Sequence, residues 1–149
     1  MTDTQRSRSA LQSLFADNTS GDISPQDLRD FLASTKLYME NRFVTVYDEA
    51  TVSIDCNSGN HFYLEASGNR TIGAPSNSSN RLSDKMIIRI KAQGADRTIT
   101  FANTIPNGYR LGADITAISG VVTEKTDYYG FIYNANSGVW DMVAYVRGY

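Results

Sequence analysis

Few residues in this chain have a type and spacing that would support catalysis. His61 is the single histidine and Cys56 the single cysteine. Multi-histidine metal sites and intramolecular disulfides are therefore excluded, and a Ser-His-Asp triad would depend on one residue. His61 begins a segment of alternating polarity, which favours a half-exposed strand position, and Cys56 ends another, where we expect a small buried hydrophobic side chain. No CxxC, HExxH or Walker-type motif is present.

Carboxylate pairs could hydrolyse a glycosidic bond, which needs two carboxyl groups on opposite sides of a bound sugar. The pairs Asp48 with Glu49 and Glu124 with Asp127 fall near turns, and we interpret them as solvated loop charges. We therefore predict a protein that is not an enzyme, with no catalytic residue, cofactor or metal site. Under the alternative of a polysaccharide-degrading enzyme, the carboxylates to test first are Glu65, Asp127 and Asp141.

Aromatic residues are the more informative class. Nine tyrosines and one tryptophan are present, and several of the tyrosines crowd the C-terminal end. Tyrosine combines a large apolar body with a polar tip, which suits both subunit interfaces and stacking on sugars. We favour subunit contacts over glycan binding. The residues considered for surface or glycan contact are Tyr128, Tyr129 and Tyr133.

Length and charge limit the class of protein. A chain of 149 residues fits one domain, or one domain with an arm. The net charge is -2 and the basic residues are scattered, whereas nucleic-acid modules gather Lys and Arg on one face. The first ten residues lack the apolar core of a signal peptide, and no run of about 18 apolar residues occurs. We expect synthesis in the cytoplasm and no nucleic-acid or membrane partner.

The elements that would position these residues are mainly strands. Period-two alternation between turn-forming segments predicts strands over residues 43–47, 51–56, 61–65, 70–72, 86–91, 98–101, 114–122, 127–133 and 139–147. Residues 92–96 and 134–138 are expected to close two hairpins, and residues 73–84 to form a long loop. This spacing predicts a mainly β fold, an antiparallel β-sandwich or jelly-roll-like domain over residues 41–149. In the last strand, one face is expected to hold Trp140, Met142, Ala144 and Val146.

The best-defined local signal is a helix start before the strands. Ser24 can serve as N-cap, and Pro25 falls at the first helical position, where its missing N–H costs nothing. Ile23 and Leu28 occupy the two positions of a hydrophobic staple. The pattern predicts a helix that runs to about Thr35.

A shorter helix is expected over residues 10–15, and the turn-forming residues 17–22 separate the two. Residues 1–40 are thus predicted to be an arm with a helix-turn-helix attachment segment. Helices this short are not stable alone, so their apolar faces must pack against another surface. The predicted interface residues are Leu11, Leu14, Phe15, Ile23, Leu28, Phe31 and Leu32.

Two parts of the sequence resemble proteins of tailed-bacteriophage particles. Residues 11–30, LQSLFADNTSGDISPQDLRD, are similar to a motif near the N-terminus of small head-decoration (cement or head-fibre) proteins and of tail or baseplate fibre proteins. Residues 68–77, GNRTIGAPSN, with RTITF at 97–101 and a closing strand at 139–140, look like the β domain that often follows it. We expect no extra stalk or large receptor-binding head, which favours the decoration type.

The resemblance implies a location and partners. It implies a virion protein, usually a homotrimer, that contacts the major capsid protein or another virion protein. The alternative that it leaves open is a tail-fibre or baseplate protein whose β domain binds a receptor or glycan on the host surface.

Replacing both Leu28 and Phe31 by Asp should abolish assembly into particles and leave the β domain folded, because the charges would have to be desolvated at the contact. Incorporation into particles and circular dichroism measure the two effects. Ser24→Ala is a milder comparison and should cost about 1 kcal/mol of helix stability. Normal incorporation of the double variant would contradict the assignment of these residues.

Overall fold

A computed structural model describes residues 28–31, 42–81, 83–115 and 117–149. The chain divides into two units, Met1–Glu40 and Asn41–Tyr149. In the first unit the described residues 28–31 are helical, and the side chains of Leu28 and Phe31 are 52% and 36% exposed. The rest of the predicted helix-turn-helix lies outside the described residues. So do the predicted interface residues Leu11, Leu14, Phe15, Ile23 and Leu32.

The second unit consists mainly of strands, which confirms the predicted mainly β class. One sheet has six strands, in the order β1 (Phe43–Thr45), β3 (His61–Ala66), β5 (Lys85–Ala92), β8 (Thr126–Asn134), β9 (Val139–Val146) and β7 (Tyr109–Leu111). The other has three, in the order β2 (Thr51–Val52), β4 (Arg70–Ile72) and β6 (Ile99–Phe101). A short 3-10 helix, η1, covers Ser78–Asn80 within the predicted long loop.

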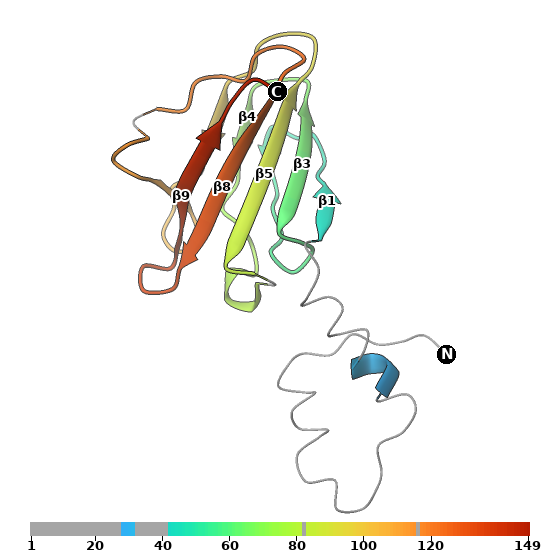
Figure 1. Cartoon of the computed structure of the whole chain (residues 1–149), viewed down its shortest axis with the longest axis vertical. Coiled ribbons are helices and arrows are strands. Elements are labelled where there is room, and N and C mark those ends of the chain that lie inside the picture. The colour runs from blue at the N-terminus through green and yellow to red at the C-terminus, as the bar shows by residue number, and fades with distance from the viewer. Residues whose placement is uncertain (1–27, 32–41, 82, 116) are drawn as a thin grey trace, which may run out of the picture. The chain divides into compact units, whose positions relative to one another are not determined.

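Up to β6, successive strands alternate between the two sheets. β1, β3 and β5 pair in parallel in the first sheet, and β2, β4 and β6 pair in parallel in the second. The chain therefore winds through three turns, each with one strand in each sheet. β8 pairs antiparallel with both β5 and β9, while β7 pairs parallel with β9, so β8 alone runs against its sheet (Figure 1).

The predicted antiparallel arrangement is thus confirmed for β5–β8 and β8–β9 and wrong for the other pairs. Residues 134–138 close the β8–β9 hairpin as predicted. Residues 92–96 instead lead from β5 into the other sheet, so the predicted hairpin with β6 does not form. Residues 114–122 form no strand where described, and an isolated bridge joins Val121 to Arg97. Period-two alternation reports which face a side chain lies on, not which strand pairs with which.

Both sheets contribute side chains to one hydrophobic core. Met86, Ile88 and Ile90 of β5 are buried in alternation, as predicted. Ala92 of β5 is buried as well, and the other strands supply further buried side chains: Val52, Phe62, Leu64, Ala66, Ile72, Ile99, Tyr109, Tyr129, Phe131, Trp140 and Met142. Because alternate residues of each strand enter this core, the remaining ones must lie on the outer faces of the sheets.

A bulge changes the buried face of β9. Trp140 and Met142 are buried as predicted, but Ala144 and Val146 are exposed, and Tyr145 packs against the core instead. The register shifts by one residue opposite the Gly130/Phe131 step of β8. An extra residue in one strand of a pair reverses the inward face beyond it, which explains why the prediction fails for the end of β9.

Within the described residues, no helix has the length and apolarity required to cross a membrane.

The shared core predicts a large difference between two leucines. Leu64 is fully buried, whereas Leu111 at the sheet edge is 36% exposed. Leu64→Ala should lower the free energy of unfolding by about 3 kcal/mol, and Leu111→Ala by less than about 1 kcal/mol. Urea denaturation followed by tryptophan fluorescence measures both values. Equal losses would mean that the core is not packed as described.

Candidate functional site: an aromatic face centred on Arg89

Aromatic and basic side chains meet on the outer face of the six-stranded sheet. The register places Tyr63 of β3 beside Arg89 of β5, and Arg89 beside Tyr128 of β8. In the adjacent row, Phe43 of β1 lies beside His61 of β3. We call these five residues the Arg89 face.

The guanidinium group of Arg89 packs on three aromatic rings. Its central carbon lies 4.9 Å from the ring centre of Phe43, 5.2 Å from that of Tyr63 and 5.9 Å from that of Tyr128. The rings of Phe43 and Tyr63 are themselves stacked, with centres 6.2 Å apart. Cation–π attraction of this kind holds a guanidinium group in place without a carboxylate.

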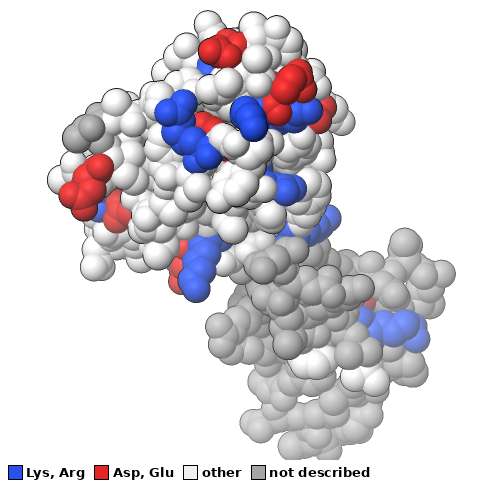
Figure 2. Space-filling view, turned by 45° about the horizontal axis from the view of Figure 1, so that its top comes forward, with Lys and Arg blue, Asp and Glu red and all other residues white. Residues whose placement is uncertain are grey.

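Arg89 has no ion pair with any residue in the described part of the chain, and its buried Nε has no hydrogen-bond acceptor there. Two other cations of the same sheet differ: Lys91 binds Glu124 at 3.0 Å, and Arg110 binds Asp141 at 2.7 Å. In the space-filling view, basic side chains cross the middle of the visible face and acidic ones lie mainly toward its rim (Figure 2). A stacked guanidinium keeps its in-plane N–H groups for a carboxylate.

His61 adds an aromatic ring to the face without adding charge. It is half-buried, as predicted, and its ring contacts the edge of Phe43 at 5.4 Å between centres. Burial lowers the pKa of His61, and the positive charge of Arg89 lowers it further. The imidazole is therefore neutral at physiological pH, and the positive charge at the centre of the face belongs to Arg89.

Exposed apolar side chains surround this centre. The outward positions of the sheet and the adjoining C-terminus expose Phe43, Ile87, Ile132, Val146 and Tyr149. Arginine and aromatic side chains, with few other charges, are typical of the buried centres of protein interfaces. Sheets with parallel strands are also commonly covered on both faces, yet no described residue layer covers this one.

The three tyrosines proposed for surface contact have different positions. Tyr128 lies on the Arg89 face, with its ring against that of Tyr149. Tyr129 is fully buried and stacks on Tyr145, so its prediction as a surface residue is wrong. Alternation in β8 makes this unavoidable, because neighbours point to opposite faces. Tyr133 is half-buried against the core, with the Arg81 guanidinium carbon 4.0 Å from its ring centre.

The carboxylates considered for catalysis each have a structural contact. Glu65 accepts a hydrogen bond from the Tyr63 hydroxyl at 2.8 Å, and Asp141 is held by Arg110. Asp127 is buried and accepts a hydrogen bond from the backbone N–H of Gly148 at 3.0 Å. Within the described residues, no group of three or more His, Cys, Asp or Glu side chains could hold a metal ion.

Cys56 is a buried free thiol, as predicted. Burial raises its pKa to about 11, so the nucleophilic thiolate is a minor species at neutral pH. Its Sγ lies 3.9 Å from the Ser78 hydroxyl, which in turn accepts a hydrogen bond from the indole of Trp140 at 3.1 Å. This cluster ties β9 to η1.

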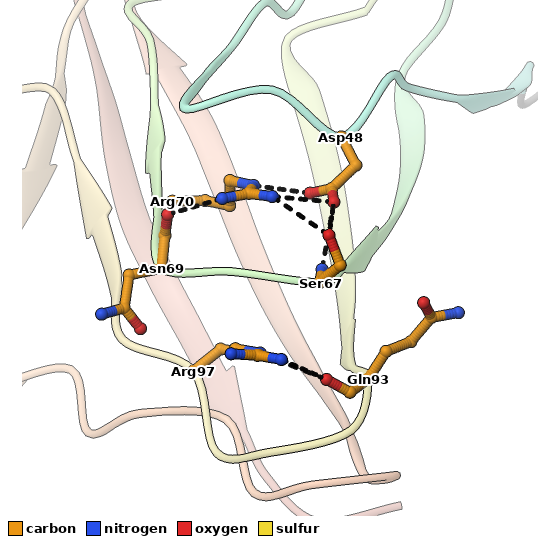
Figure 3. A network of polar contacts seen from close by, with 6 residues as sticks. All are labelled: Asp48, Ser67, Asn69, Arg70, Gln93 and Arg97. Atoms are coloured by element: carbon orange, nitrogen blue, oxygen red, sulfur yellow. Dashed lines mark hydrogen bonds and ion pairs between the residues drawn. The ribbon is translucent and has the colours of Figure 1, made fainter.

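A second polar network connects the chain segments near the β3–β4 turn (Figure 3). Asp48, beyond β1, accepts hydrogen bonds from Arg70 Nε at 2.6 Å and from the Ser67 backbone N–H at 3.1 Å. Nearby, Arg97 donates to the carbonyl of Gln93 at 2.6 Å. Because Asp48 is satisfied by Arg70 and Ser67, and the Arg97 guanidinium by the Gln93 carbonyl, we interpret this network as structural.

Comparison of the chain with protein-family models, with curated proteins and with solved structures found no significant match. The Arg89 face and the sequence motifs are therefore the features that bear on function. Sequence reasoning identified Tyr128 but missed Phe43, Tyr63 and Arg89. Tyr63 and Arg89 each lie between core residues in a predicted strand, which places them on its outer face. That position became informative only when the strand register showed that they are neighbours.

The Asp48–Arg70 pair predicts a specific loss of stability in acid. The hydrogen bonds from Arg70 and Ser67 hold the pKa of Asp48 well below its usual range. The stabilisation is therefore fully present above about pH 4, the pKa of an unfolded aspartate, and is lost as the pH falls toward the folded value.

Asp48→Asn should thus lower the free energy of unfolding by about 1 kcal/mol at pH 7. Its difference from the wild type should shrink below pH 4. Urea denaturation at a series of pH values measures this, with Asp114→Asn as a control because exposed Asp114 has no ion pair among the described residues. A difference independent of pH would show that the charge of Asp48 does not matter.

Proposed function

We propose that this chain is a structural component of a bacteriophage particle, a homotrimeric capsid decoration (cement) protein that stabilises the head by contacting major capsid subunits. The observation that carries the proposal is the Arg89 face, an exposed apolar surface with an unpaired cation on a well-packed β unit. A surface of this composition is suited to binding protein rather than to chemistry. The resemblance of residues 11–30 and 68–77 to virion proteins supports the choice of partner.

In this proposal the two parts of the chain have different roles. Residues 1–40 form the helical attachment segment, with Leu28 and Phe31 among its contact residues. Residues 41–149 form a small two-layer β-sandwich that presents the Arg89 face. A stable protein–protein contact buries about 800 Å² on each partner, and an exposed sheet face is large enough to contribute that area.

Clamping is the physical effect that such a protein would have on a capsid. The decoration protein buries apolar surface across the boundary between two capsid subunits. This surface becomes exposed to water again when the subunits separate. At roughly 25 cal/mol per Å², each contact adds resistance to the outward pressure of packaged DNA. The decoration protein therefore raises the force or temperature at which the shell opens.

A tail-fibre or baseplate protein that binds a host glycan is the second candidate. It is favoured by the partly exposed rings of Phe43 and Tyr63 around the free guanidinium of Arg89. A carboxylated sugar could place its carboxylate on Arg89 and its C–H face on Phe43. Binding of glucuronate-containing but not neutral oligosaccharides, lost in Arg89→Gln, would support this candidate.

Particles of the encoding phage provide the direct test. Immunogold labelling against the chain should mark the head, and purified protein added to particles that lack it should raise the temperature at which DNA is released. Arg89→Glu should bind such particles at least tenfold more weakly, because it reverses the charge at the centre of the surface through which the protein is proposed to assemble. Lys85→Glu, at an exposed position of the same strand, is the matched control. Label on the tail would favour the second candidate, and unlabelled particles would refute both.

A further inference from the structure

The winding begins at β1 and β2, and no other described strand covers this end, which we call the open end. Among residues 42–149 as described, β1 pairs only with β3 and β2 only with β4. The first turn therefore has a free edge in both sheets. Free edges and exposed core ends are normally covered, because they otherwise pair with other chains.

A hollow of about 220 Å³ lies at this end, and every residue that lines it belongs to residues 44–58. Val44 and Val46 reach the core from one side only and stay half-exposed. Tyr47 beside them is 87% exposed. The hollow thus exposes apolar side chains of the first turn to solvent.

The hollow also carries a free carboxylate. Glu49 lines it, is exposed, and has no ion pair or hydrogen bond with any residue of the described part of the chain. Asp55, the other acid there, already accepts hydrogen bonds from the Asn57 backbone at 2.9 Å and the Asn77 side chain at 2.8 Å. Glu49 is therefore the acid of this end that is available to a partner.

We propose that the Arg89 face binds the open end of a second copy of this chain, with Glu49 of that copy as the carboxylate for Arg89. The inference deepens the self-assembly included in the proposed function and rests on it. Among the described residues, one surface has a cation without an acid and the other an acid without a cation, and both are rimmed by exposed apolar side chains. Contact between two identical Arg89 faces would instead bring two uncompensated guanidinium groups together.

The two surfaces adjoin, which determines the kind of assembly. β1 borders both of them, since Phe43 lies on the outer face and its neighbour Val44 turns to the core at the open end. A contact between two different surfaces is head-to-tail, and it makes either a ring or a filament. Surfaces at opposite ends would propagate a filament. Adjoining surfaces instead favour a rotation between successive copies, and we therefore expect a small closed ring.

Charge reversal tests this pairing in the full-length chain. Sedimentation velocity over a range of concentrations should give a closed oligomer for the wild type. Arg89→Glu and Glu49→Arg should each weaken self-association at least tenfold. The double variant Arg89→Glu/Glu49→Arg should restore it to within about threefold of the wild type, because the pair is re-formed with opposite polarity. Lys85→Glu should have no effect.

Circular dichroism verifies folding. If a reversed charge prevents folding, Arg89→Gln and Glu49→Gln replace the reversals, and they should also weaken association. A monomeric wild type, single variants that associate normally, or a double variant no better than the single ones would each overturn the pairing. None of these results would change the expectation that immunogold marks the phage head. Conversely, a ring that responds as expected but never binds particles would refute the proposed function and keep the pairing.

Discussion

The packing of two sheets against one core is the constraint on which the rest of this structure depends. Each strand gives alternate side chains to the core, so the others have no choice but to face outward. In β5 the buried side chains of Ile88 and Ile90 leave Arg89 on the outer face. The aligned register of β3, β5 and β8 then brings the rings of Tyr63 and Tyr128 to the two sides of that arginine.

Much of the strand content follows from the sequence alone, whereas the way the strands pair does not. Alternation located β3, β4, β5, β8 and β9, and the turn at residues 134–138 identified the one local hairpin. The parallel pairs join strands that are far apart in the chain, such as His61 with Ile87. Their partners are chosen by long-range packing, which no local pattern records. The bulge opposite Gly130 is a further example, because it reverses the buried face of β9 without a signal in the alternation.

The same limit explains what sequence reasoning found at the site. Crowding of tyrosines directed attention to residues 128–133, and Tyr128 does lie on the Arg89 face. Tyr129 is its neighbour and therefore points into the core, where it stacks on Tyr145. Arg89 was missed because a lone basic residue in a strand is ordinary until its neighbours are known. Its importance arises from the three rings around it, which come from three other strands, and from the lack of an acidic partner among the described residues.

The central claim is that the Arg89 face is covered by another chain in the assembled protein. Hydroxyl-radical footprinting of the free and assembled states, read by mass spectrometry, measures this directly. Oxidation of Phe43, Tyr63 and Tyr128 should fall severalfold on assembly, while Ile105, which is 80% exposed on the loop between β6 and β7, should be oxidised equally in both states. Unchanged oxidation of the three rings in a confirmed assembly would contradict the account.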